Sequence, residues 1–312
     1  MAKYVFGVDL GGTTVKLGFF QVDGTVLDKW EIPTRKENSG SEILPDIAKS
    51  INDYLANKGI DKSDVAGVGI GVPGPVDDEG VIYKAANLGW GVFSVKDTLE
   101  KLVGMPVKAG NDANVAALGE MWKGGGEGHK SLVAVTLGTG VGGGIIINEK
   151  ILTGATGAAG EIGHIHIEDS ETEKCGCGNK GCLEQYASAT GISRLAKKKL
   201  ASSDKDSVLR NSDMSAKAVF DAVKEKDALA IEVAEEFGSY LGKGLAAIAA
   251  VVNPEIFVIG GGVSKAGEIL FDYIRPSYEE YVFHRSRDIE FALAKLGNDA
   301  GIYGSARMII GD

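Results

Sequence analysis

Hydrophobic and polar positions repeat along the chain with two different periods, which predicts a mixed α/β protein. Apolar residues recur at helical spacing from Ile43 to Leu55, and Gly59 lies just beyond them, where a helix would end. The apolar run at 65–72 is typical of a buried strand, and a Pro-Gly-Pro turn follows it. The predicted strands are 3–8, 15–22, 65–72, 107–109, 132–137, 144–147 and 256–259, and the predicted helices are 43–55, 113–122, 228–252 and 299–309.

Glycine-rich turns interrupt this pattern at three places. Of the 312 residues, 45 are glycine, which is about twice the usual share. A strand, a glycine turn and a second strand follow one another around residues 7–16 and again around residues 135–144. A third glycine cluster, at 260–262, follows an apolar strand. Two copies of one hairpin predict two similar domains, and a chain of this length can form two.

The glycine turns are candidate phosphate-binding sites. Consecutive backbone N–H groups in a tight turn point to one side and attract an anion, and glycine leaves room for it to approach. Asp9, at the end of the first strand, is a candidate ligand for the hydrated Mg²⁺ that a nucleotide carries. One such turn alone is more typical of an ordinary hairpin. Three of them in one chain favour phosphate binding.

Two other glycine patterns match the G-x-G-x-x-G sequence of dinucleotide-binding proteins but lack its context. In the pattern at 69–74, Pro73 and Pro75 occupy the positions where a helix should open. The pattern at 138–143 leads into the predicted strand 144–147 instead of a helix. The sequence also contains no Walker A motif. These observations argue against a Rossmann site and a P-loop.

Asn111 and Asp112 lie between a short predicted strand and a predicted helix. A carboxylate at such a junction can accept the proton of an attacking sugar hydroxyl, as a general base does. The amide of Asn111 can bind hydroxyl groups beside it. Asparagine and aspartate are also favoured N-cap residues of helices. Both interpretations can hold, with one residue as the cap and the other as the functional group.

All three cysteines, Cys175, Cys177 and Cys182, fall within eight positions. Their odd number argues against a disulfide framework. Three thiols on a glycine-rich loop need one more ligand for a closed tetrahedral zinc site, and His164 or His166 could supply it. The spacing does not choose between the two histidines, because both would lie on the same side of a strand. The alternative is three reduced thiols without a metal.

Two glutamates, Glu161 and Glu184, flank the cysteine cluster. Single glutamates are usually solvated surface groups. A zinc loop would hold both carboxylates rigidly, and rigid carboxylates suit hydrogen bonding to sugar hydroxyls. Both residues are therefore candidates for substrate binding.

Composition and charge exclude several classes of protein. Hydrophobic residues make up 44% of the chain and charged residues 24%, which is close to a globular average, and the formal net charge is −10. Such an acidic chain lacks the basic face expected of a nucleic-acid-binding protein. No apolar run approaches the about eighteen residues of a membrane helix, and the first residues do not resemble a signal peptide. We therefore expect a cytoplasmic protein that binds neither nucleic acid nor membranes.

Five motifs occur in a fixed order along the chain. They are DLGGTTVK at 9–16, GNDAN at 110–114, LGTGVGGG at 137–144, GEIGH at 160–164 and CGCGNKGCLE at 175–184. Together they resemble the ROK family (repressor, open reading frame, kinase), and most closely its bacterial glucokinases. The resemblance covers essentially the whole chain. It implies an actin-like, ribonuclease-H-like fold with two domains around a cleft for ATP and sugar, usually as a homodimer or a dimer of dimers.

The resemblance also implies roles for the sugar-side residues. Asp112 would be the catalytic base, and Asn111 a sugar ligand beside it. The other implied sugar-binding residues are Glu161, His164, Glu184 and Asn87. The implied zinc ligands are His164, Cys175, Cys177 and Cys182, so that only the resemblance favours His164 over His166.

On the nucleotide side, the resemblance implies two phosphate turns and a loop near the adenosine. The implied residues are Asp9, Gly11, Gly12, Thr13, Thr14 and Lys16 in the first turn, Gly138, Thr139 and Gly140 in the second, and Gly260, Gly261 and Gly262 in the loop. Only eight residues precede Asp9, so the helix-turn-helix segment of the family's repressors is not expected here.

We predict an ATP-dependent glucokinase that acts on the 6-hydroxyl of glucose, with Mg²⁺ and a structural Zn²⁺. The predicted smaller domain comprises residues 1–117 and 300–312, and the larger domain residues 118–299. Kinases of fructose, mannose, allose, N-acetylglucosamine or N-acetylmannosamine are the nearest alternatives, and polyphosphate is an alternative donor. Two further alternatives belong to functional classes other than sugar kinases, namely a non-catalytic sugar sensor and an actin-like chaperone ATPase.

Overall fold

The computed structural model describes residues 2–85 and 87–311. Their contacts divide the chain into two compact units. Unit 1 comprises residues 1–132, 144–160 and 295–312, and unit 2 comprises residues 133–143 and 161–294. The predicted boundary between residues 117 and 118 falls inside a helix, and the contacts keep that helix in unit 1. The two-domain boundary stays a prediction.

The first sheet belongs to unit 1 and has the strand order β3-β2-β1-β4-β7. Its first three strands pair antiparallel, whereas β4 is parallel to both β1 and β7. The strands are β1 (Tyr4–Leu10), β2 (Thr14–Gln21), β3 (Val26–Pro33), β4 (Val65–Val72) and β7 (Val107–Asn111), and β5 (Val81–Ile82) pairs separately with β6 (Phe93–Ser94). The helices of this unit are α1 (Glu37–Gly40), α2 (Ile43–Lys58), α3 (Val95–Val103), α4 (Asp112–Lys123) and α10 (Ala300–Ile310).

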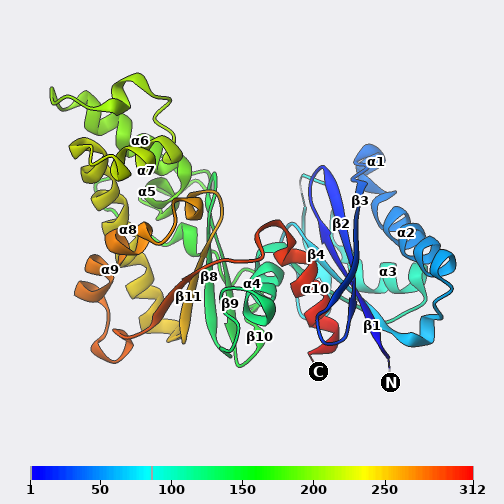
Figure 1. The fold of residues 1–312 in the computed structure, drawn as a ribbon. Coiled ribbons are helices and arrows are strands. Elements are labelled where there is room, and N and C mark those ends of the chain that lie inside the picture. The colour runs from blue at the N-terminus through cyan, green and yellow to red at the C-terminus, as the bar shows by residue number, and fades with distance from the viewer. Residues whose placement is uncertain (1, 86, 312) are drawn as a thin grey trace. The chain divides into compact units, whose positions relative to one another are not determined.

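Helices cover both faces of this sheet. Neighbouring residues of one strand point to opposite faces, so Phe6 packs with α2 and α3 whereas Val5 packs with Ile302 of α10. Helix α10, from the end of the chain, lies against β1 from its beginning (Figure 1). The approach is close, because a Cβ at Gly7 of β1 would overlap the carbonyl oxygen of Ile302 in α10. This packing brings the C-terminal helix next to the carboxyl end of β1.

The second sheet has the strand order β10-β9-β8-β11-β12. Its strands are β8 (Leu132–Leu137), β9 (Val141–Ile147), β10 (Lys150–Ile151), β11 (Ile256–Gly260) and β12 (Glu290–Leu293). The helices of unit 2 are α5 (Glu184–Ala187), α6 (Ala189–Ala201), α7 (Ala216–Lys224), α8 (Ala228–Val252) and α9 (Ile269–Tyr281). The long helix α8 packs against α9, α6 and α7.

Many of the predicted elements are confirmed at or near their predicted bounds. Strands β4 and β8 and helix α8 match the predicted residues, and α2 ends at Gly59 in a left-handed cap. Strand β9 differs, because it begins at Val141 and not at residue 144. The glycines of this stretch therefore belong to the strand, and the second turn is confined to Gly138–Gly140.

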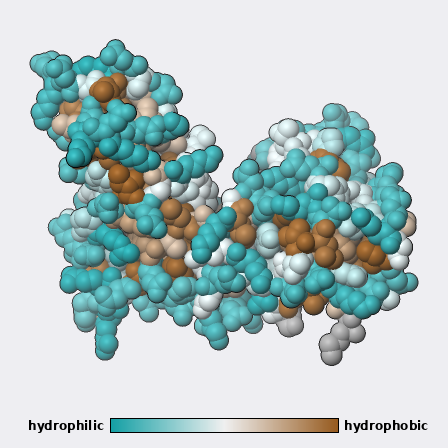
Figure 2. Space-filling view, in the orientation of Figure 1, coloured by the Kyte–Doolittle hydropathy of each residue, from teal (hydrophilic) through white to brown (hydrophobic). Residues whose placement is uncertain are grey.

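The face of the molecule drawn in Figure 2 is mainly hydrophilic. On the face that Figure 2 shows, the hydrophobic residues lie in separated groups. Some large apolar side chains are exposed, among them Val251 and Phe283. Within residues 2–85 and 87–311, none of the helices combines the length and the apolar character that crossing a membrane requires.

Candidate active site

The first glycine turn is a tight hairpin between β1 and β2. The N–H of Gly11 donates to the carbonyl of Thr14 at 3.0 Å, and the Thr34 hydroxyl donates to the Gly11 carbonyl at 2.8 Å. The side chain of Asn87 lies beside this turn, since a Cβ at Gly12 would be 3.9 Å from its amide nitrogen. Asn87, predicted as a pocket wall, therefore belongs to the surroundings of the first turn.

Asp9 lies opposite Lys16 in the β1–β2 pair and faces the start of α10, where a Cβ at Gly301 would crowd its carboxylate. Burial, followed by the charge of Asp112, raises the pKa of Asp9 to about 6, and Lys16 opposes the shift. The structure thus brings two carboxylates of the candidate site near one another. Such a pair attracts a cation, which would relieve their repulsion.

Asn111 is the N-cap of α4, and Asp112 is the first residue of that helix. The side-chain Oδ1 of Asn111 accepts from the N–H groups of Ala113 and Asn114 at 3.1 and 3.2 Å. The side-chain Nδ2 of Asn111 donates to the Gly74 carbonyl and to Asp112 Oδ1, both at 3.1 Å. Asn111 is thus the cap and orients the Asp112 carboxylate. Its predicted role as a sugar ligand stays a prediction.

The second and third glycine clusters meet in unit 2. The N–H of Gly138 donates to the carbonyl of Gly140 at 3.0 Å, which closes the turn between β8 and β9. Gly261 has a φ of 85° and lies against the backbone of Leu137, at the end of β8. The N–H of Ala189, at the start of α6, donates to the Gly138 carbonyl at 2.8 Å. Two of the three predicted nucleotide-binding segments are therefore neighbours.

The three thiols and His164 gather at one place in unit 2. One ligand atom from each residue lies within 4.8 Å of the others. Cys175 Sγ is 3.7 Å from His164 Nδ1, and Cys177 Sγ is 3.6 Å from Cys182 Sγ. Burial, more than the neighbouring thiols, raises the pKa of Cys182 to about 12, which favours the protonated thiol. A bound metal cation would instead favour the thiolate. Three thiolates and one imidazole are the donor set of a closed tetrahedral site, so these residues fit a structural zinc ion.

His166 lies outside this cluster. Its ring nitrogens are 2.9 Å from the Lys180 carbonyl and 2.8 Å from Asp169 Oδ1, and its side chain is 57% exposed. His164 instead has Nδ1 toward the thiols and Nε2 4.0 Å from a carboxylate oxygen of Glu161. The structure therefore groups His164, and not His166, with the cysteines.

Glu184 lies between the cysteine cluster and the second turn. Its Oε2 accepts a hydrogen bond from the N–H of Val141 at 3.0 Å, and its Oε1 lies 3.6 Å from Cys175 Sγ. A Cβ at Gly140 would overlap the same carboxylate. A side chain at position 140 would therefore displace the Glu184 carboxylate.

The sequence analysis did not identify the buried ion pair that holds the cysteine loop. Glu171, whose side chain is 3% exposed, accepts from Arg194 of α6 at 2.5 Å and from the hydroxyl of Tyr186 at 2.6 Å. It also accepts from the N–H groups of Thr172 and Glu173. The hydrogen bond from Arg194 is the main reason why the pKa of the Glu171 carboxyl lies well below its usual range. No local sequence pattern marks the pair, because its partners lie 23 residues apart.

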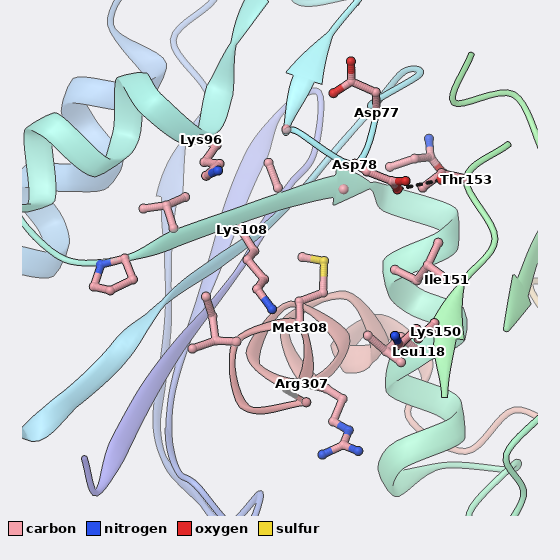
Figure 3. Close-up of a pocket in the computed structure, with 18 of the residues that line it drawn as sticks. Asp77, Asp78, Lys96, Lys108, Leu118, Lys150, Ile151, Thr153, Arg307 and Met308 are labelled. Atoms are coloured by element: carbon pink, nitrogen blue, oxygen red, sulfur yellow. Dashed lines mark hydrogen bonds between the residues drawn. The ribbon is translucent and has the colours of Figure 1, made fainter. Parts of the chain in front are cut away.

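A cavity of about 710 Å³ lies along β7 in unit 1. Four basic side chains from different elements line it, namely Lys96, Lys108, Lys150 and Arg307 (Figure 3). Arg307 pairs with Glu149 at 3.1 Å, and Asp78 accepts from the hydroxyl of Thr153 at 2.7 Å. Among the candidate site residues only Asn111 lines this cavity. The sequence analysis did not predict it.

Comparisons with known proteins agree with the motifs. Residues 5–311 match the ROK family. The chain is 46% identical to a glucokinase of Halalkalibacterium halodurans, over 98% of this chain and 95% of that protein, and 38% identical to a glucokinase of Thermotoga maritima, over 98% and 96%. A crystal structure of a ROK family glucokinase from Streptomyces griseus, in complex with glucose and AMPPNP, is similar with a TM-score of 0.71 and 35% identity, over 98% of both chains.

The chain therefore belongs to the ROK family. The two sheets with their covering helices are the actin-like ATPase fold of ROK sugar kinases, as the resemblance implied. Both predictions, the family and the fold class, are confirmed.

Proposed function

We propose that this protein is a glucokinase, which transfers the γ-phosphoryl group of ATP to the 6-hydroxyl of glucose. The observation that carries this proposal is the similarity to bacterial glucokinases along the whole chain. The geometry of Asp112 supports it, because a carboxylate fixed at a helix start is suited to act as a general base.

Unit 1 supplies the base and part of the phosphate site. Asp112 accepts the proton of the 6-hydroxyl, and the oxygen becomes a better nucleophile toward the γ-phosphorus. Asn111 holds the Asp112 carboxylate in place. The backbone N–H groups of the first turn balance charge on the phosphates. Asp9 would hold the hydrated Mg²⁺ of the nucleotide, and this ion supplies further charge neutralisation.

Unit 2 supplies ligands for the sugar and for the rest of the nucleotide. Glu161, His164 and Glu184 bind sugar hydroxyls and orient the ring. The second turn binds phosphate, and the loop at 260–262 lies near the adenosine. His164, Cys175, Cys177 and Cys182 would hold a structural zinc ion, and this ion supplies rigidity to the loop that carries them.

An assay of ADP release over a panel of sugars tests the proposal. The panel contains glucose, fructose, mannose, allose, N-acetylglucosamine and N-acetylmannosamine, with ATP or inorganic polyphosphate as donor. We expect the highest kcat/KM with glucose and ATP. A higher value with another sugar would reassign the substrate, and sugar binding without turnover would identify a sensor. ATP hydrolysis that needs no sugar would point to an ATPase.

We further propose that the protein acts as a homodimer or a dimer of dimers. This assembly is what the resemblance to the family's kinases implies. Light scattering coupled to size-exclusion chromatography measures the molar mass, and a mass of about one chain would contradict the proposal.

A further inference from the structure

The cavity along β7 lies entirely within unit 1, so its shape depends on that unit alone. Strand β7 is at the edge of the first sheet, and α3, β10 and α10 supply other parts of the wall (Figure 3). The volume of about 710 Å³ falls in the range of about 300–1,000 Å³ that is usual for small-molecule sites. Of the candidate active-site residues only Asn111 lines this cavity. The cavity is therefore a candidate site of its own.

Three lysines reach the cavity from separate elements, namely Lys96 from α3, Lys108 from β7 and Lys150 from β10. In the view of Figure 3, Lys108 lies between the other two. Among the residues that the structure describes, the ammonium groups of Lys96 and Lys150 donate to no other group. Lys96 and Lys108 are half-buried, so less water surrounds their charges than on an open surface. The wall thus presents positively charged donors that the protein itself does not satisfy.

Carboxylates line the same cavity, but groups of the protein already donate to them. Glu149 pairs with Arg307 at 3.1 Å, so these two charges balance one another. Asp77 accepts from two backbone N–H groups and from a hydroxyl. Asp78 and Glu100 each accept one hydrogen bond, through Oδ1 and Oε2, and within the described chain their second oxygens accept none. These two oxygens remain available as acceptors for a ligand.

We propose that this cavity is a second ligand site, which binds a sugar phosphate. A phosphate monoester carries roughly two negative charges near neutral pH and three acceptor oxygens, which match the ammonium donors of the lysines. The sugar hydroxyls donate to the available oxygens of Asp78 and Glu100. A phosphate ion alone would place its charge against these carboxylates, and an unphosphorylated sugar would leave the ammonium groups without an anion. The wall therefore suits a ligand that combines both groups.

Calorimetry with glucose 6-phosphate tests the site, with inorganic phosphate as the comparison and with glucose and AMPPNP filling the proposed active site. We expect glucose 6-phosphate to bind about tenfold more tightly than inorganic phosphate. Lys108→Met and Lys150→Met each remove one ammonium group and keep most of the aliphatic stem, and we expect each to weaken binding by about tenfold. The control is Lys101→Met, on the exposed side of α3 and outside the cavity, which should bind like the wild type. Equal weakening in all three variants, or equal affinity for the two probes, would overturn the proposal.

Hydrogen exchange without nucleotide or free sugar locates the bound ligand. We expect glucose 6-phosphate to slow exchange at 96–111 and 149–153, and Lys150→Met to reduce this effect. Slower exchange confined to the turns at 11–14 and 138–140 would place the ligand at the proposed active site and would overturn the proposal. Slower exchange at the cavity in a protein without kinase activity would support it and would contradict only the proposed function.

Discussion

Asp9 is held in an environment that opposes its own ionisation. It is buried beside the start of α10, and the charge of Asp112 acts on it as well. A group with a pKa of about 6 in the folded protein and about 3.8 when unfolded favours folding less as it loses its proton. The ionised carboxylate of Asp9 carries the negative charge that a cation-binding residue needs. The structure thus keeps a carboxylate where it costs stability and supports the proposed function.

Replacing Asp9 by asparagine should therefore raise stability, and the gain should depend on pH. The displacement of the pKa from 3.8 to about 6 corresponds to about 3 kcal/mol. The wild type loses this contribution as the pH rises from about 4 to about 6, whereas Asp9→Asn does not. We expect the free energy of unfolding of Asp9→Asn to exceed that of the wild type by about 2–3 kcal/mol at pH 8 and by little at pH 4. Urea unfolding at both pH values measures this, and an equal difference at the two would refute the electrostatic account.

Asp112→Asn tests the proposed base. The amide keeps the size of the side chain but cannot accept a proton, so kcat should fall by about two to four orders of magnitude. Glucose should still bind, because the predicted hydroxyl ligands of unit 2 remain. Steady-state kinetics and calorimetry with glucose measure the two effects separately. Near-normal turnover would remove the assignment.

For Asn111 and Asp112 the sequence could predict the chemistry but not which of the two residues caps the helix. That Asn111 is the cap and holds the Asp112 carboxylate follows from side-chain contacts that the motif does not contain. Likewise, the choice of His164 over His166 needed either the resemblance or the structure. The two residues are equivalent by spacing, and only the path of the loop brings His164 to the thiols.

Elements with a continuous apolar pattern were predicted well, and those with mixed patterns were missed. Strand β3 is at the sheet edge, and its residues alternate between half-buried and exposed, with Asp28 and Lys29 among them. Helix α9 contains Pro276 in its interior, which local rules treat as a helix breaker. Both form because tertiary packing outweighs local preference. The pattern of apolar residues alone therefore misses some edge strands and some of the helices that pack around a sheet.

The Glu171–Arg194 pair joins the cysteine loop to α6, and its loss should release the loop. Removing one partner of a buried ion pair leaves an uncompensated charge, which costs about 3–5 kcal/mol. We expect Glu171→Ala to lower the free energy of unfolding by about this amount and to increase the rate of zinc loss to a chelator. Glu173→Ala, on the exposed side of the same arginine, should change stability by less than about 1 kcal/mol. Similar effects of both substitutions would show that the buried pair has no special role.

At the scale of the whole molecule, sequence order and spatial grouping differ. Residues 144–160 and 295–312 return to unit 1 after the chain has entered unit 2. A local pattern cannot predict such a return, because it depends on contacts between distant segments, such as β1 with α10. The motifs nevertheless name the candidate residues, because each motif holds its residues within a few positions, and the roles of these residues stay predictions. The structure adds which motifs share a unit.

This grouping leads to a prediction about metal removal. All four cluster residues belong to unit 2, so loss of zinc should loosen that unit and leave unit 1 unchanged. Cys177→Ser should lose zinc, weaken glucose binding and speed hydrogen exchange at 161–188, while exchange in β1 and β4 stays as in the wild type. His166→Gln is the matched control, because its side chain lies outside the cluster, and it should retain zinc. Metal analysis and exchange mass spectrometry check both variants. Zinc loss from His166→Gln would contradict the assigned zinc ligands. Normal glucose binding by zinc-free Cys177→Ser would contradict the positioning role of the cluster.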